Sequence, residues 1–192
     1  MIIVLLGASG SGKSIIENEL ATHHGFEKII SYTTRPPRDG EINGKDYYFT
    51  NNETFREMVE DRLLAEYDEY SQGRLYGTLR IDYTGNTNRV VVLTPNGFKQ
   101  LKDSCGSDNV FSVLVEASLG TRMKRYVDRC GVNKFSYDDK NEIASRVERD
   151  FGMFLGIEKE VDLVIHNNEG EDIPLLAKII MDECKRKCGD LK

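Results

Sequence analysis

The first residues with recognisable chemistry lie in a glycine-rich stretch that reads Gly-Ala-Ser-Gly-Ser-Gly-Lys-Ser. It fits G-x-x-x-x-G-K-[ST], the pattern of a loop that wraps the phosphates of a nucleotide. Glycines let successive backbone N–H groups turn toward an anion, while Lys13 can reach the terminal phosphates and the Ser14 hydroxyl can ligate Mg²⁺. We therefore expect the whole stretch to form a nucleoside triphosphate site with Ser14 as the metal ligand: Gly7, Ala8, Ser9, Gly10, Ser11, Gly12, Lys13 and Ser14.

The sequence on either side of this stretch has the character that such a loop requires. Met1 to Leu6 is a continuous apolar run, as expected of a buried parallel strand. Ile15 to His24 is compatible with a helix, whose N-terminus adds a positive field at the loop. A glycine-rich turn between two core elements would explain the glycines, but not the order of strand, loop, Lys-Ser and helix.

A second group of residues suited to phosphate binding follows the first helix. Arg35 and Arg38 stand on a loop that two prolines stiffen, and guanidinium groups bind phosphate through two parallel hydrogen bonds. Tyr47 and Tyr76 can each donate a hydroxyl to the same anion. Taken alone, the two arginines would be better explained as a solvated basic turn.

The predicted elements alternate between strands and helices, apart from one strand-rich block. Within that block, over residues 32–83, we predict a strand over 45–49, a helix opened by the capping box Thr50-x-x-Glu53, and a hairpin over 63–70 and 74–81. The other predicted elements are strands over 28–31, 89–93, 110–115 and 161–165 and helices from Pro95 and over 118–130, 140–158 and 173–188. Such alternation predicts an α/β fold, a parallel sheet flanked by helices with ligands at the carboxyl ends of its strands.

Composition limits the kinds of partner. The 192 residues are 39% hydrophobic and 30% charged, with a net charge of −6 that argues against general nucleic-acid binding. No apolar run is long enough to cross a bilayer, and no signal peptide is recognisable. The four scattered cysteines form no disulfide framework. We expect a cytoplasmic protein, monomeric or homodimeric, that binds neither nucleic acid nor membrane.

The second group has a longer context that closely resembles guanylate kinases. About twenty residues after the Lys-Ser pair, the chain reads Ser-x-Thr-Thr-Arg-x-Pro-Arg-x-Gly-Glu-x-x-Gly-x-Asp-Tyr-x-Phe without gaps. The resemblance runs from Ile2 to about Asn168 and is weak between residues 82 and 116. It implies a P-loop NTPase-type sheet as core (1–31, 84–120 and 158–192), a monophosphate-binding insertion (32–83) and a helical lid (about 121–157) in a single domain.

The resemblance also implies which residues bind the acceptor, GMP or dGMP. Arg35, Arg38, Tyr47 and Tyr76 would hold its phosphate, and Glu41 would orient the arginines or contact the acceptor. Glu66 would face guanine, whose N1–H and 2-amino group suit a carboxylate; Tyr67 and Glu69 are alternatives for this position, because the spacing to Tyr76 is one residue longer than usual. The full acceptor set is Ser31, Arg35, Arg38, Glu41, Tyr47, Glu66, Tyr76, Gly77, Thr78 and Thr94.

Later matches to the family are looser. The pair Arg125-x-x-x-Arg129 resembles the lid helix, whose arginines close over the ATP phosphates. Arg146 resembles the lid arginine that reaches the transferring phosphoryl group, with Arg149 as a second candidate. Asn167 resembles a residue near the ATP base. For Arg129 and Arg146 a solvated basic helix face is the alternative interpretation.

One departure concerns the strand before Asn96. The family carries Asp-x-Asp there, near guanine and the metal, whereas this chain has Val92 and Thr94. A carboxylate is therefore missing, and Glu116 and Asp82 are candidates to replace it.

Taken together, the resemblance implies transfer of the γ-phosphoryl group of ATP to GMP or dGMP with Mg²⁺. The catalytic residues would be Lys13, Arg35, Arg38, Arg129 and Arg146. The alternatives are a related P-loop kinase acting on another nucleotide or a sugar phosphate, and a non-catalytic guanylate-kinase-like binding module.

Overall fold

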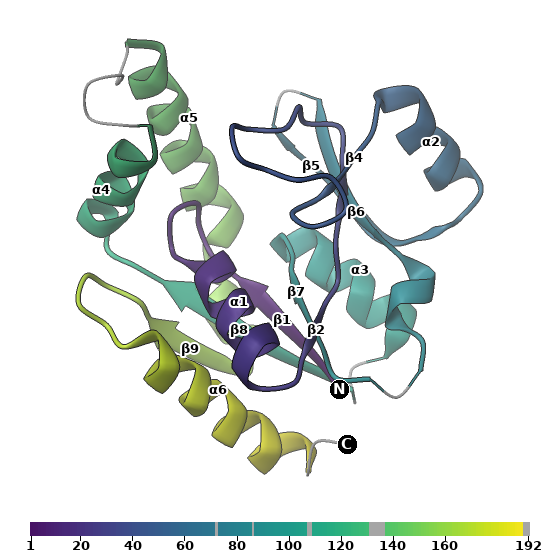
Figure 1. The fold of residues 1–192 in the computed structure, drawn as a ribbon, viewed down its shortest axis with the longest axis vertical. Helices are drawn as coiled ribbons and strands as arrows, with labels where there is room; N and C mark the ends of the chain where they lie inside the picture. Colours follow the sequence, from purple (N-terminus) through teal and green to yellow (C-terminus); the bar gives the residue numbers. More distant parts are fainter. Residues whose placement is uncertain (72, 86, 107–108, 131–136, 190–192) are drawn as a thin grey trace.

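The core of the molecule is a sheet of five parallel strands, seen in a computed structural model that describes residues 1–71, 73–85, 87–106, 109–130 and 137–189 (Figure 1). In spatial order the strands are β2 (Glu27–Lys28), β7 (Arg89–Val92), β1 (Ile2–Leu6), β8 (Val110–Glu116) and β9 (Leu163–His166). All neighbouring pairs run parallel, and β1 lies in the centre with every residue buried. The predicted α/β class is therefore confirmed.

Helices cover both faces of this sheet because successive side chains of β1 point to opposite sides. Ile3 and Leu5 pack with α1 (Lys13–His23) and α6 (Ile173–Cys188). Ile2, Val4 and Leu6 pack on the other face with α3 (Pro95–Cys105) and with Ile157, which lies in a single 3₁₀ turn over Ile157–Lys159. Burial on both faces explains why the first strand is an unbroken apolar run.

The strand-rich block forms a separate small sheet beside the core. Its spatial order is β4 (Tyr48–Phe49), β3 (Tyr32–Thr33), β6 (Arg74–Leu79) and β5 (Leu64–Ser71). The sheet is mixed: β3 runs parallel to β4, whereas β6 is antiparallel to both of its neighbours. Helix α2 (Asn52–Glu60) buries Phe55 and Met58 against it, and a 3₁₀ turn over Arg80–Tyr83 leads back to the core.

Two helices stand over the opposite side of the carboxyl edge. These are α4 (Leu119–Cys130) and α5 (Tyr137–Phe154), and Figure 1 shows them facing the small sheet across the end of β1. Part of the segment predicted as the lid, residues 131–136, lies outside the described residues. In the described part of the chain, no helix is long and apolar enough to cross a membrane.

Several predicted boundaries were wrong for local reasons. The cap of α2 is Asn51, whose side chain accepts from the Thr54 N–H, because Thr50, just after β4, still donates its N–H to the Thr33 carbonyl of β3. Of the strand predicted over 28–31 only Lys28 is strand, at the end of β2 in the core sheet, and the next strand, β3, starts at Tyr32 and joins the small sheet. The helix predicted over 140–158 spans Tyr137–Phe154, and Gly156 just beyond it takes a left-handed φ of 82°.

Two hydrogen bonds between β8 and the residue just before β9 give a first prediction. Asp162 accepts hydrogen bonds from both the N–H and the hydroxyl of buried Ser112, at 2.8 and 2.9 Å. Replacing Asp162 by Ala leaves both donors without this acceptor and should lower the free energy of unfolding by about 2 kcal/mol. Urea unfolding measures this, with the exposed Asp182→Ala on α6 as control. Equal stability of the two variants would contradict the assignment.

Candidate active site

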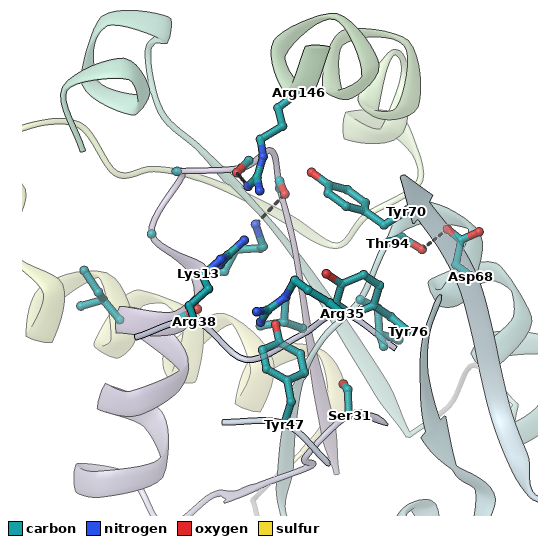
Figure 2. Close-up of a pocket in the computed structure, with 18 of the residues that line it drawn as sticks. Lys13, Ser31, Arg35, Arg38, Tyr47, Asp68, Tyr70, Tyr76, Thr94 and Arg146 are labelled. Carbon is teal, nitrogen blue, oxygen red and sulfur yellow. Dashed lines mark hydrogen bonds between the residues drawn. The ribbon is translucent and has the colours of Figure 1, made fainter. Parts of the chain in front are cut away.

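One cavity of about 450 Å³ lies where the carboxyl ends of β1 and β7 meet the small sheet and the α4–α5 pair. Its wall includes the glycine-rich loop on one side and, on another, the loop that carries Arg35 and Arg38, here called the arginine loop. Residues of β5 and β6 form its far end. Figure 2 shows the charged ends of Lys13, Arg35 and Arg38 turned toward one space, with Arg146 reaching in from α5. Cations from three separate segments therefore converge on a single pocket.

The glycine-rich loop is held in shape by its own lysine. The Lys13 ammonium donates to the carbonyl oxygens of Gly7 and Ala8, at 2.7 and 3.1 Å. Burial lowers the pKa of Lys13 to about 8, and nearby Asp150 opposes that shift. In this conformation the ammonium closes the loop on itself, and a bound phosphate would supply a stronger acceptor at the same place.

Side chains from outside the loop hold its remaining carbonyl groups. The Arg125 guanidinium donates to the oxygens of Gly10 and Ser11, both at 3.1 Å. The buried Asn167 amide donates to the Ser11 oxygen at 2.9 Å and accepts from Arg125. Gly12 has a φ of 96°, and a Cβ placed there would lie 2.1 Å from the Asn167 nitrogen. Only glycine fits between the loop and this amide.

A buried carboxylate also touches the loop. Asp150 of α5 is 1% exposed and accepts from the Ser9 N–H at 2.7 Å and from Arg122 at 2.7 Å. It accepts a third bond, of 2.8 Å, from the hydroxyl of Tyr70 on β5, whose ring lies 4.0 Å from the Arg149 guanidinium carbon. This network joins the loop, both helices over the carboxyl edge, and the small sheet.

The arginine loop is preorganised by Glu41. Arg35 is 4% exposed and donates two hydrogen bonds to the Glu41 carboxylate, at 2.8 and 2.9 Å. Glu41 also accepts from the Arg38 N–H at 2.7 Å. Burial, followed by the charges of Arg35 and Arg146, lowers the pKa of Arg38. Positive groups thus crowd one another here, as expected at a site for an anion.

The far end of the cavity carries a buried carboxylate instead. Glu66 is 4% exposed, accepts from the Thr78 hydroxyl at 2.7 Å, and has a pKa raised to about 7 by burial. Gly97 of α3 makes room for it, because a Cβ there would lie 2.4 Å from a Glu66 oxygen. Of the alternatives, Tyr67 is 42% exposed and neither it nor Glu69 lines the cavity.

Most of the predicted site residues line this cavity. They are Gly7, Ser9, Gly10, Gly12, Lys13, Ser14, Ser31, Arg35, Arg38, Tyr47, Glu66, Tyr76, Gly77, Thr94, Arg129 and Arg146. The others lie behind the lining or elsewhere: Ser11, Glu41, Thr78 and Asn167 support lining residues, and Ala8 lines a neighbouring pocket. Asn167 therefore contacts the loop from behind instead of facing the cavity.

Wall residues that sequence reasoning did not single out include Asp68 and Tyr70 of β5 and Asp128 of α4, whereas Arg125, which belongs to the motif matched to the lid helix, does line the cavity. Asp68 accepts from the Thr94 hydroxyl at 2.6 Å, so a carboxylate does stand at the end of β7, although β5 supplies it. Glu116 and Asp82, the candidates to replace the missing acid, do not line the cavity. Charge at alternate positions of β5 was the available signal, because residues 66 and 68 share one face of the strand.

This fold and site define a P-loop protein of the class that moves phosphoryl groups between nucleotides. The guanylate kinase family profile matches residues 1–183. The guanylate kinase of Streptococcus thermophilus is 33% identical over 185 residues, which cover 93% of this chain and 82% of that enzyme. The guanylate kinase of Lactobacillus delbrueckii subsp. bulgaricus is 48% identical over 80 residues, 41% of this chain and 39% of that enzyme.

A solved structure agrees with the fold. The crystal structure of guanylate kinase from Anaplasma phagocytophilum superimposes with a TM-score of 0.73 at 23% identity, and covers 99% of this chain and 87% of that one. The chain belongs to the guanylate kinase family.

The close approach at Gly12 gives a second prediction. Gly12→Ala should abolish measurable ATP binding, because the new methyl group forces the Asn167 amide away from the loop. Gly25→Ala is a matched control, since Gly25 also has a positive φ, of 73°, but nothing lies within 4 Å of its would-be Cβ. Both variants should lose about 1 kcal/mol of stability through backbone strain. Calorimetric ATP binding by Gly12→Ala at the level of the control would contradict the prediction.

Proposed function

We propose that this cavity carries out the reaction of its family, transfer of the γ-phosphoryl group of ATP to GMP or dGMP. The observation that carries the proposal is the distribution of charge in one pocket. Lys13, Arg35, Arg38 and Arg146 converge on one space, and the buried carboxylate of Glu66 lies at the far end. Phosphates suit the first group, and a base with two adjacent N–H donors suits the second.

On the donor side, the glycine-rich loop would bind the ATP phosphates. Its backbone amides and Lys13 would contact the β- and γ-phosphates, and Arg129 would close over them. The exposed Ser14 hydroxyl, at the start of α1, fits Mg²⁺, which takes few protein ligands and keeps water and phosphate oxygens as the others. When bound, Mg²⁺ neutralises charge on the phosphate oxygens. Asn167 would support this loop through Ser11.

On the acceptor side, Arg35 and Arg38 would hold the phosphate of GMP, with hydroxyls from Tyr47 and Tyr76. Glu41 fixes Arg35 from behind, so the guanidinium loses little entropy on binding. Ser31, Glu66 and Gly77 would surround guanine, and Thr78 would orient the Glu66 carboxylate. Adenine lacks the N1–H and 2-amino donors and would leave this carboxylate unpaired.

Transfer itself needs alignment and charge neutralisation, not a covalent intermediate. Arg38 would hold the attacking phosphate oxygen in line, while Lys13 and Arg146 would stabilise the charge that develops on the moving group. The insertion over 32–83 and the lid over about 121–157 would close on the core and exclude water. The alternatives, another kinase specificity and a non-catalytic module, are not favoured, because the family match is broad and Lys13 and Ser14 are both present.

A third prediction tests the arginine loop. Arg38→Ala should lower kcat/KM for GMP by at least about a hundredfold, because one charged contact to the acceptor is lost. Binding of ATP measured alone should stay unchanged. Arg56→Ala on the exposed face of α2 removes the same charge from the same sheet region and serves as control. Equal GMP kinetics for the two variants would refute the assignment of Arg38.

A fourth prediction concerns pH. The Glu66 pKa of about 7 means that this side chain is largely protonated below pH 7 and then offers guanine a donor where an acceptor is required. GMP affinity should therefore fall as pH decreases from about 8 to 6, approaching tenfold per pH unit. The phosphate of GMP titrates near pH 6 as well, so Glu66→Gln provides the comparison. This variant should bind GMP more weakly, and its pH profile should keep only the inflection near pH 6 that comes from the phosphate. Identical pH profiles would contradict the role of Glu66.

A further inference from the structure

The carboxylate of Asp68 occupies a position that the proposed function leaves without a role. It lines the cavity from β5 and contacts residues that follow β7. Neither Val92, at the end of β7, nor Thr94, two residues on, brings a negative charge. One Asp68 oxygen accepts from the Thr94 hydroxyl at 2.6 Å, and the other from the Asn96 amide at 3.0 Å. Figure 2 shows the first of these bonds at one side of the pocket.

The N-terminus of α3 fixes this carboxylate in place. Thr94 is the N-cap of α3 and accepts from the Gly97 N–H at 3.0 Å. Its hydroxyl has a single proton, which it donates to Asp68. The positive end of the helix favours an anion at this position. Asp68 is therefore held in a defined orientation, and each of its oxygens has a second lone pair left for a ligand.

Asp68 and Glu66 form a pair along β5. They are two residues apart, so their side chains share a face of the strand, and both line the cavity. Burial raises the pKa of Glu66, and the negative charge of Asp68 adds to that shift, as expected of two carboxylates that face one cavity. Other groups near Glu66 are the Thr78 hydroxyl and, through it, the hydroxyl of Tyr83.

We propose that Asp68 is the second acidic residue of the acceptor pocket and accepts the hydrogen of the guanine 2-amino group that Glu66 leaves unused. This inference rests on the proposed function, since it assigns a further contact to the same acceptor. Thr94 is then a positioning residue: it orients Asp68 with its only proton and has none to donate to the base. The carboxylate expected at the end of β7 is then supplied by β5, a strand of the small sheet.

The spacing of the two carboxylates suits this amine. The two N–H bonds of an exocyclic amine diverge by about 120°, so acceptors at about 2.9 Å from the nitrogen stand roughly 5 Å apart. Residues i and i+2 of a strand have Cβ atoms about 6.7 Å apart, and short carboxylate side chains on one face can reach that separation. Glu66 would accept from N1–H and one amine hydrogen, and Asp68 from the other.

The test compares nucleotides that differ by one group. IMP lacks only the 2-amino group of GMP, and dGMP lacks only the ribose 2′-hydroxyl. Equilibrium binding of all three would be measured by calorimetry without ATP, at about pH 8, where Glu66 with its pKa of about 7 is ionised in every variant. The variants are Asp68→Asn, which keeps the shape of the side chain, and Glu69→Gln, an exposed neighbour that loses the same charge.

We expect Asp68→Asn to weaken GMP binding by about tenfold or more and to leave IMP binding within about twofold, so that the preference for GMP over IMP collapses. Glu69→Gln should keep that preference. Steady-state kcat/KM values for GMP and IMP should show the same pattern.

Three results would overturn the proposal. Unchanged affinities for both GMP and IMP in Asp68→Asn rule out the contact, and an equal loss of affinity for both nucleotides makes Asp68 merely structural. A change in the GMP-to-dGMP ratio alone would place Asp68 on the ribose. Failure of the proposed function is distinguishable, because the unmodified protein would then not phosphorylate GMP at all.

Discussion

The contact between the glycine-rich loop and the Asn167 amide is the constraint on which the remaining site depends. Asn167 follows β9, and Arg125 on α4 bonds both the loop and this amide. Because β8 lies between β1 and β9, these groups meet behind the loop only in a sheet with the observed strand order. The loop is therefore shaped by tertiary packing as well as by its glycines.

Charge in the cavity is arranged along its length. Lysine and arginine side chains predominate at the end near α1, α4 and α5, where Asp128 also lines the wall, whereas the carboxylates of Glu66 and Asp68 stand at the end formed by β5 and the N-terminus of α3. A nucleoside monophosphate is complementary to this arrangement, with an anionic phosphate and a base that can donate hydrogen bonds. This arrangement would orient a nucleoside monophosphate through long-range electrostatics before the close contacts form.

Residues that are contiguous in the sequence could be predicted well. The loop from Gly7 to Ser14 and the arginine loop after Ser31 act through local conformation, so their glycines and prolines indicate the geometry directly. The sheet followed from apolar periodicity. Asp68, Tyr70 and Asp150 could not be found in this way, because their roles depend on which strand or helix lies opposite. Asp68 acquires its role when β5 packs on α3, and Asp150 when α5 packs beside the loop.

The bond between Tyr70 and Asp150 has a consequence for how the two substrates influence each other. Tyr70 belongs to the sheet that would hold the acceptor, and Asp150 to the helix beside the donor loop. The Asp150 carboxylate also accepts from the Ser9 backbone N–H, a donor that a bound phosphate would otherwise use. Triphosphate binding that displaces this carboxylate would also break its bond with Tyr70 and so change the sheet on the other side of the cavity. Thermodynamic linkage requires the effect to be reciprocal, so that each nucleotide alters the affinity for the other by the same factor.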